Sequence, residues 1–104
     1  MVHITGGGFY DNIPRALPEN MSVEIDTSRW KMPTIFRLLQ EWGNVDWKEM
    51  YRTFNMGIGM IIIASPEESE KMKSALESKG EQVFEIGVVK KGNHDVTLKG
   101  GVFD

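Results

Sequence analysis

The chain has 104 residues, of which 40% are hydrophobic and 26% are charged, and its formal net charge is −3 at pH 7. This length suits one domain covering residues 1–104, and the composition is typical of a soluble globular protein. The absence of cysteine excludes disulfides and thiolate-bound metals and favours a reducing, cytoplasmic location. The acidic balance argues against a nucleic-acid-binding protein, and no apolar run is long enough to cross a membrane.

The first predicted elements follow a run of three glycines at positions 6–8. A short helical turn at most is expected around Pro14, and Pro18 stops it. Residues 21–26 alternate between apolar and polar side chains, a pattern typical of a strand with one buried face.

Two helices are predicted next. Pro33 suits a first helical position, apolar residues then recur at helical spacing as far as Trp42, and Gly43 is expected to end the helix in a left-handed conformation. Residues 46–49 have the pattern of a capping box, so a second helix is expected over residues 47–53. Trp42 lies on the apolar stripe of the first helix and is therefore expected in the core.

The second half of the chain contains an apolar segment without alternation, residues 57–64. Such a segment predicts a strand in the middle of a sheet that is covered on both faces. Ser65 and Gly80 are typical of the two ends of a helix, and residues 83–90 and 96–98 are expected to form two further strands. The side chains expected on one face of the first of these strands are Phe84, Ile86 and Val88. The predicted fold class is therefore α/β of the α+β type, with a mixed β-sheet covered by helices.

The first candidate site surrounds the glycine run. Consecutive glycines allow backbone amides to point toward one place, and they remove side chains that would keep a ligand away. Thr5 can donate a hydroxyl hydrogen bond, and His3 can exchange a proton near neutral pH. These residues indicate a site for a phosphate or a carboxylate. The alternative is a flexible loop, which three glycines alone would favour.

The second candidate site lies in the segment that joins the second helix to the apolar run. Gly57 and Gly59 indicate a close approach of the backbone, and Arg52 and Asn55 carry donors suited to a phosphate or an amide. The alternative is that the glycines make room for a packed helix and that Arg52 is a surface charge. The two histidines lie far apart in the sequence, so no metal site is expected.

Two segments resemble the signatures of one enzyme family. They read His-Ile-Thr-Gly-Gly-Gly-Phe at 3–9, continued by Asn-Ile-Pro-Arg at 12–15, and Met-Tyr-Arg-Thr-Phe-Asn-Met-Gly-Ile-Gly-Met at 50–60. Both are similar to motifs of the aminoimidazole ribonucleotide synthetases, also called phosphoribosylformylglycinamidine cyclo-ligases. Many members have cysteine where this chain has Met56, which favours a packing role for that side chain.

The resemblance implies a larger, two-domain enzyme that acts as a dimer, with this chain as the latter part of the second domain. We therefore expect a chain that lacks its beginning and is inactive alone. The family uses ATP to close the imidazole ring of formylglycinamidine ribonucleotide in purine biosynthesis, with release of ADP and phosphate. ATP and Mg²⁺ are bound mainly by the amino-terminal domain, so the expected partners are the ribonucleotide, ATP and the rest of the enzyme.

The resemblance also implies roles for individual residues. His3 and Thr5 are the predicted catalytic residues. The residues predicted to bind the substrate or its phosphate are Gly6, Gly7, Gly8, Asn12, Arg52 and Asn55. A homo-oligomer is expected as well, because the apolar run at 57–64 would otherwise lack neighbours.

Several other enzyme families share this architecture and are alternatives to the cyclo-ligase. Selenophosphate synthetase, thiamin-phosphate kinase, the hydrogenase maturation factor and formylglycinamidine ribonucleotide synthetase share it, but they tend to have aspartate where this chain has His3. An alternative from another class is a non-catalytic assembly or phosphate-binding module. Catalysis that appears when the missing segments are supplied would favour the enzyme.

Overall fold

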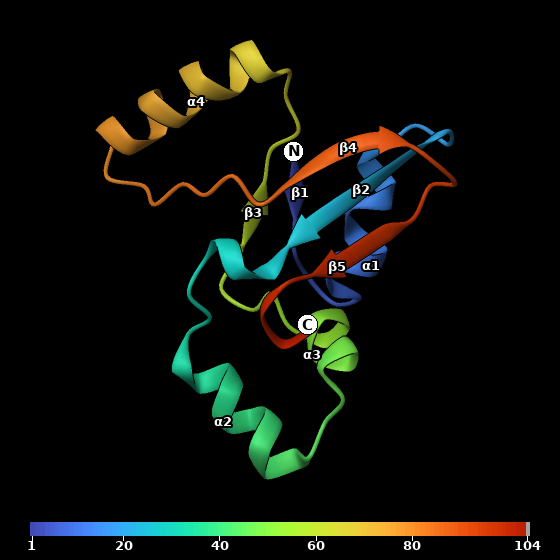
Figure 1. Cartoon of the computed structure of the whole chain (residues 1–104). Coiled ribbons are helices and arrows are strands. Elements are labelled where there is room, and N and C mark those ends of the chain that lie inside the picture. The colour runs from blue at the N-terminus through green and yellow to red at the C-terminus, as the bar shows by residue number, and fades with distance from the viewer. Residues whose placement is uncertain (104) are drawn as a thin grey trace.

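The alternating segment forms strand β2 (Met21–Asp26), the central strand of a three-stranded sheet (Figure 1). In this computed structural model, which describes residues 1–103, β4 (Gly87–Lys91) pairs with β2 in the antiparallel direction. Strand β5 (Val96–Lys99) pairs with the other edge of β2 in parallel, so the sheet is mixed, as predicted. The register places Val23 opposite both Val89 and Val96.

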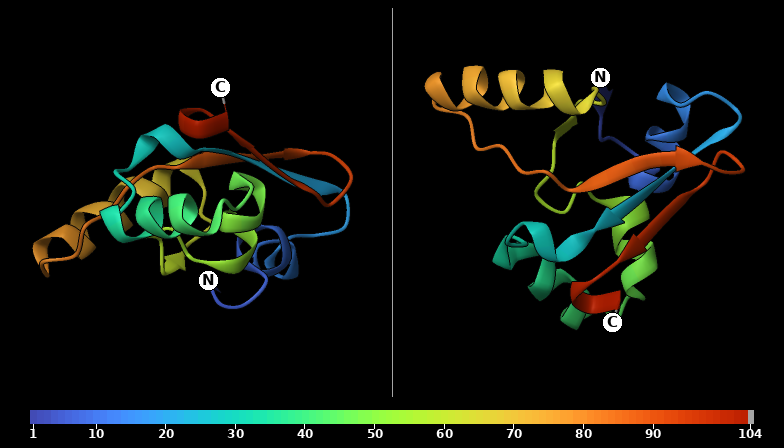
Figure 2. Two further views of the ribbon diagram at one scale, coloured as in Figure 1. Left: turned by 90° about the horizontal axis from the view of Figure 1, so that it is seen from below. Right: turned by 45° about the horizontal axis from the view of Figure 1, so that its top comes forward.

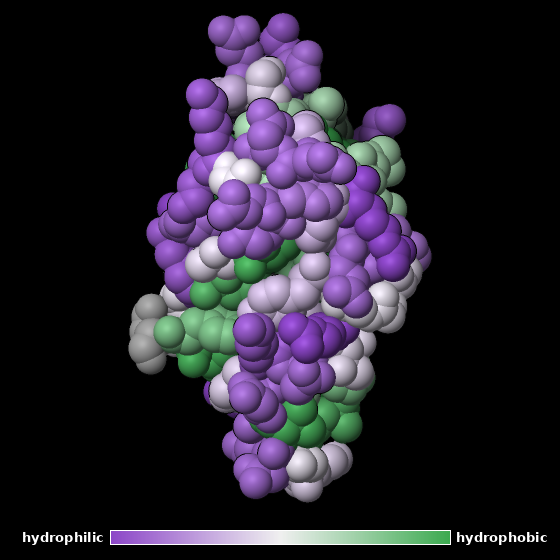
Figure 3. Space-filling view, turned by 90° about the vertical axis from the view of Figure 1, so that its right-hand side faces the viewer, coloured by the Kyte–Doolittle hydropathy of each residue, from purple (hydrophilic) through white to green (hydrophobic). Residues whose placement is uncertain are grey.

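Helices cover one face of this sheet (Figure 2). Val23 and Ile25 are buried on that face, where helices α1 (Gly8–Asn12) and α3 (Trp47–Thr53) lie. The opposite face carries Glu24, which forms ion pairs with Lys90 and Lys99. Seen from the right-hand side of Figure 1, the surface is mostly hydrophilic, with narrow hydrophobic areas between the polar residues (Figure 3).

The core is built around aromatic side chains from three separate segments. Phe9 of α1 is fully buried, and its ring centroid lies 6.0 Å from that of Trp30 and 5.4 Å from that of Tyr51. The indole N–H of Trp30 donates a hydrogen bond of 3.1 Å to the carbonyl oxygen of Met56. Met56 is itself fully buried, which confirms its predicted packing role.

Helix α3 has the predicted bounds because its amino-terminal signals are local. The carboxylate of Asp46 accepts a hydrogen bond of 3.0 Å from the backbone N–H of Lys48, which supplies a partner for one of the free amides of the first turn. Met50 and Tyr51 are buried, so the apolar stripe of the helix faces the core.

Helix α2 (Thr34–Gly43) ends differently from the prediction. Asn44, and not Gly43, adopts the left-handed conformation, with a φ of 48°. The predicted place of Trp42 in the core is wrong, because its side chain is 74% exposed. Phe36 and Leu39 pack against the core instead, so the buried stripe of α2 is narrower than its apolar stripe.

The prediction of a central, fully covered strand over residues 57–64 is wrong. Within that segment the strand is β3 (Met60–Ile61), which pairs antiparallel with β1 (Val2–His3) in a separate two-stranded sheet. Ile58 is buried, but Ile62 and Ile63 are exposed. The run is apolar enough for a central strand, yet no strand among residues 1–103 pairs with its second edge.

Helix α4 (Pro66–Ser78) begins at the predicted cap, where the Ser65 hydroxyl accepts a hydrogen bond of 3.3 Å from the N–H of Glu68. The helix stands apart from both sheets, and none of its residues is buried (Figures 1 and 2). Its apolar side is therefore open, as the exposed side chain of Met72 shows. No helix in residues 1–103 is both long and apolar enough to span a membrane.

Strand β4 begins later than the sequence predicts. The strand starts at Gly87, where a Cβ would lie 2.2 Å from the carbonyl oxygen of Glu24, so glycine allows the two backbones to approach closely. The predicted common face of Phe84, Ile86 and Val88 is wrong. Ile86 packs against the core, whereas Val88 is 62% exposed.

Candidate functional site

The glycine run forms a tight bend that packs directly on α3. Gly7 and Gly8 have φ values of 94° and 59°, a left-handed conformation that most other residues avoid. A Cβ on Gly8 would lie 2.0 Å from the carbonyl oxygen of Tyr51. Glycine at position 8 is therefore required for contact between the bend and α3, and Gly8 is buried in that contact.

Asn12 ties the bend together. Its side-chain oxygen accepts hydrogen bonds from the backbone N–H of Thr5, at 2.6 Å, and from the Thr5 hydroxyl, at 3.3 Å. Its side-chain nitrogen donates to the carbonyl oxygen of Gly6 at 3.3 Å. Asn12 is buried and these bonds occupy both ends of its amide, so its position suits holding the loop.

The bend leaves some backbone amides free. The N–H of Gly8 donates to the carbonyl oxygen of Thr5 at 2.9 Å. Within residues 1–103, the N–H groups of Gly6 and Gly7 have no hydrogen-bond acceptor. Free amides of this kind can hold the oxygen atoms of an anion.

A shallow recess of about 330 Å³ lies next to the bend. Among its walls are His3 from β1, Asn12 from α1, and Arg15 from the short helical turn η1 (Pro14–Ala16). The structure thus brings together two of the predicted site residues, His3 and Asn12. Arg15 was not predicted to be part of the site, although it is the last residue of the continued first signature at 12–15 and carries a positive charge.

The other predicted site residues do not line this recess: Thr5, Gly6, Gly7, Gly8, Arg52 and Asn55. The guanidinium of Arg52 pairs with Glu49 at 3.1 Å and lies 5.3 Å from the centre of the Tyr10 ring. Burial raises the pKa of the Tyr10 hydroxyl, and the nearby charge of Arg52 opposes that rise. The side-chain oxygen of Asn55 accepts a hydrogen bond of 2.9 Å from the N–H of Gly57, a local turn contact.

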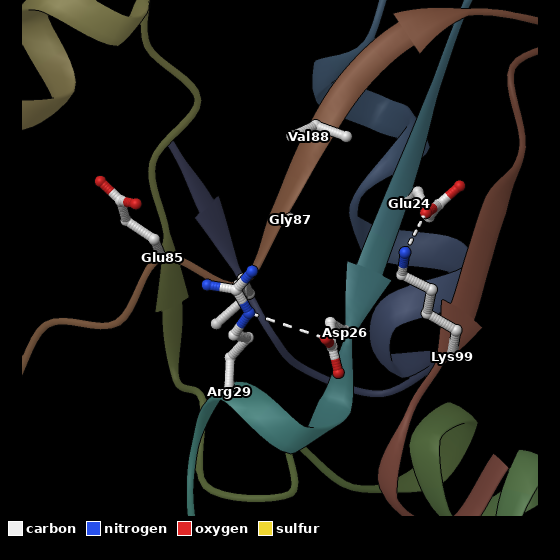
Figure 4. A pocket seen from close by; sticks show the side chains of 8 residues that line it. Glu24, Asp26, Arg29, Glu85, Gly87, Val88 and Lys99 are labelled. Carbon is white, nitrogen blue, oxygen red and sulfur yellow. Dashed lines mark ion pairs between the residues drawn. The ribbon is translucent and has the colours of Figure 1, made fainter. Parts of the chain in front are cut away.

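A second recess, of about 150 Å³, lies beside strands β2 and β4 (Figure 4). Four of its charged side chains form two ion pairs: Asp26 lies 3.6 Å from Arg29, and Glu24 lies 2.5 Å from Lys99. Glu85 also lines the recess and has no ion-pair partner among residues 1–103, so the lining carries more acidic than basic groups and does not favour an anion such as a phosphate.

Acidification should destabilise the fold through Glu24. Hydrogen bonds from Lys90 and Lys99, together with their charges, lower the pKa of Glu24 from 4.5 to about 2. A carboxylate whose pKa is lower in the folded chain stabilises it fully above the unfolded value, and this contribution is lost as pH falls through the folded value. The denaturant concentration at the unfolding midpoint should therefore decrease as the pH is lowered from about 4.5 to about 2. The decrease should be smaller in Glu24→Gln. The same pH dependence in both proteins would contradict this assignment.

Comparison with known proteins places the chain among close relatives. Residues 1–99 match the family model described as AIR synthase related protein, C-terminal domain. The chain is 46% identical over 101 residues to the phosphoribosylformylglycinamidine cyclo-ligase of Chromobacterium violaceum, with 94% of this chain and 29% of that protein covered.

Two further relatives carry the same name. The cyclo-ligase of Neisseria meningitidis serogroup C is 45% identical over 95 residues, covering 91% of this chain and 28% of its own length. That of Thermoanaerobacter sp. is 47% identical over 98 residues, covering 94% of this chain and 29% of its own length. The chain therefore spans less than a third of the length of the curated relatives it matches.

Proposed function

The chain belongs to the AIR synthase related proteins through their C-terminal domain, and from this membership we propose that it contributes the substrate-phosphate region of a phosphoribosylformylglycinamidine cyclo-ligase. The reaction proposed is the ATP-dependent closure of formylglycinamidine ribonucleotide to aminoimidazole ribonucleotide, with ADP and phosphate released. The observation that supports it best is the recess that is lined by His3 and by Asn12, the residue whose side chain is hydrogen-bonded to Thr5 and Gly6 of the glycine bend.

The chemistry requires a leaving group to be made. An amide oxygen leaves poorly, so its phosphorylation by ATP gives an iminophosphate, which an internal nitrogen of the substrate then attacks, and the oxygen departs as phosphate. A site for such a reaction works by positioning the reactants and by stabilising charge on phosphoryl oxygens. The free amides of Gly6 and Gly7 suit that stabilisation.

The other predicted residues take complementary roles in this proposal. His3 is exposed at the recess and moves a proton, while Thr5 orients the substrate through its hydroxyl oxygen. Asn12 fixes the bend, because both ends of its amide are already bonded. Gly8 provides the contact with α3. Arg52 and Asn55 lie outside the lining of the recess, so their predicted role at the border of the same cleft stays a prediction.

ATP and Mg²⁺ are proposed to bind chiefly to the parts of such an enzyme that correspond to its amino-terminal domain. Within residues 1–103, no three metal-binding side chains come together, so no metal contact is assigned to this chain. We propose that the complete enzyme is cytoplasmic and forms a homo-oligomer.

A chimeric enzyme would test the function. Residues 2–99 would replace the matching segment of the Chromobacterium violaceum cyclo-ligase, and formation of aminoimidazole ribonucleotide from purified substrate and ATP would be followed. Turnover close to that of the parent enzyme is expected. A chimera that folds and oligomerises like its parent but makes no product would overturn the proposal.

Replacing His3 with alanine in this chimera should lower turnover by about 100-fold, the size of effect expected when a group that moves a proton is lost. Met60 lies opposite His3 in the β1–β3 pair, so Met60→Ala disturbs the same strands and keeps the imidazole. The control should retain turnover within a few-fold of the chimera. Unchanged turnover and substrate affinity in His3→Ala would remove His3 from the mechanism.

A further inference from the structure

We propose that Arg15 is the residue that binds the substrate's phosphate group in the recess, and that His94 holds the turn which carries it. This inference rests on the proposed function of the recess but assigns two residues outside the predicted site. Arg15 lies on the wall that also carries His3 and Asn12.

Among residues 1–103, Arg15 differs from the other three arginines, each of which contacts an opposite charge or an aromatic ring. Arg29 pairs with Asp26 at 3.6 Å, Arg52 pairs with Glu49 at 3.1 Å, and Arg37 lies 6.0 Å from the centre of the Trp47 ring. In the part of the chain that the structure describes, Arg15 has no ion-pair partner and no aromatic ring beneath it. An exposed guanidinium beside a recess presents a planar set of donors that matches two phosphate oxygens at once.

The charges near the bend also favour this wall. The carboxylate of Asp11 lies beside Gly7, since a Cβ on Gly7 would be 2.6 Å from its oxygen. A negative charge there disfavours an anion bound by the Gly7 amide alone. Asp11 is absent from the recess lining, which includes Arg15 and His3. An anion is therefore held best on the side of the bend where Arg15 lies.

The turn that carries Arg15 is held firmly in place. The N–H of Leu17 donates to the carbonyl oxygen of Pro14 at 3.0 Å, and Ile13 and Leu17 are buried on either side of the turn. The ring Nε2 of His94 lies 2.6 Å from the carbonyl oxygen of Pro14 and 3.1 Å from that of Leu17. Both partners are acceptors, so Nε2 carries a proton and donates to both.

His94 makes this contact from a conformation that most residues avoid. Its φ is 64°, in the bend between β4 and β5, about eighty positions along the chain from the turn it contacts. Residues in such a conformation persist only where surrounding contacts hold them. His94 therefore connects the end of the sheet to the turn at residues 13–17, and it acts on the recess through Arg15 without touching the ligand.

The binding of inorganic phosphate to the 104-residue chain tests the role of Arg15. Amide NMR titrations would compare the wild type with Arg15→Gln, Arg15→Lys and the matched control Arg29→Gln, which removes the same charge away from the recess. Wild-type shifts are expected at His3, Gly6 and Asn12. The dissociation constant should rise about tenfold in Arg15→Gln, less in Arg15→Lys, and remain unchanged in Arg29→Gln. Equal binding by the wild type and Arg15→Gln, or no binding by the wild type, would overturn the inference.

A His94→Asn variant tests the positioning role of His94. Asparagine tolerates a positive φ, so this substitution keeps the backbone conformation, but the asparagine side chain is too short to reach Pro14. Phosphate binding should weaken although Arg15 is intact, and unchanged affinity would overturn the positioning role. The chimeric enzyme separates this inference from the proposed function. An active chimera whose KM is unchanged by Arg15→Gln overturns only the assignment of Arg15, whereas a chimera that folds and oligomerises like its parent but is inactive overturns the function.

Discussion

Replacing Gly8 with alanine should lower the free energy of unfolding by about 3 kcal/mol or more, because two costs add. A Cβ at this position would lie 2.0 Å from the carbonyl oxygen of Tyr51 and 2.8 Å from the carbonyl atoms of Arg52. These are backbone atoms within α3, so they cannot rotate away as the end of a side chain could. The φ of 59° is also unfavourable for alanine. Urea denaturation followed by tryptophan fluorescence measures the effect.

Gly6→Ala is the matched control for this substitution. A Cβ on Gly6 would meet no atom within 4 Å, and Gly6 has no positive φ. Its free energy of unfolding should stay within about 0.5 kcal/mol of the wild type. Equal losses in the two variants would mean that the packing of the glycine bend on α3 does not stabilise the fold.

Replacing Phe9 with alanine should cost about 3 to 5 kcal/mol, the usual range for deleting a buried aromatic ring. Phe9 is fully buried, and its ring contacts those of Trp30 and Tyr51. Its removal therefore separates α1, α3 and the segment after β2 from one another. Since small domains are stable by only about 5 to 15 kcal/mol, a large share of the chains should be unfolded in mild denaturant.

Phe84→Ala removes the same side chain from a position that is 42% exposed. The free energy of unfolding should fall by less than about 1 kcal/mol, because little buried apolar surface is lost. A loss as large as that of Phe9→Ala would show that Phe84 is covered in solution, by self-association or by another part of the chain. Sedimentation of the wild-type chain would tell these two cases apart.

Elements with signals inside their own sequence were predicted well. The bounds of α3 follow from the Asp46 cap and the positions of Met50 and Tyr51, all of which act within two turns. Strand β2 was predicted from its alternation, and its two neighbours supply the apolar contacts that such alternation requires. Local hydrogen bonding and one buried face are enough to determine these elements.

Elements whose structure depends on distant neighbours were predicted poorly. The apolar composition of residues 57–64 indicates a covered strand, but composition does not say which strands are present to pair with it. Trp42 continues an apolar stripe, yet the helix turns only Phe36 and Leu39 toward the core. Strand β4 starts only at Gly87, where its backbone closely approaches that of β2, a contact with residues more than sixty positions away.

The candidate site shows the same division. The glycine bend at residues 6–8 and its resemblance to a family signature could be recognised from the sequence. The structure places His3 and Asn12 at one recess. The sequence pattern does not show that the amide of Asn12 bonds to Thr5. It also does not show that His94 contacts the turn that carries Arg15. The specific roles of His3, Thr5, Arg52 and Asn55 stay predictions.

The arrangement of the three-stranded sheet has a consequence for how the chain acquires its fold. The central strand spans residues 21–26, but the partners of its two edges span residues 87–91 and 96–99 and are synthesised more than sixty positions later. The edges of β2 therefore cannot take the partners they have in the folded sheet until those two strands have emerged from the ribosome. Pairings between such distant positions form slowly, and an unpaired apolar strand is prone to join another chain. Aggregation during expression should therefore compete with folding most strongly before the last strand arrives.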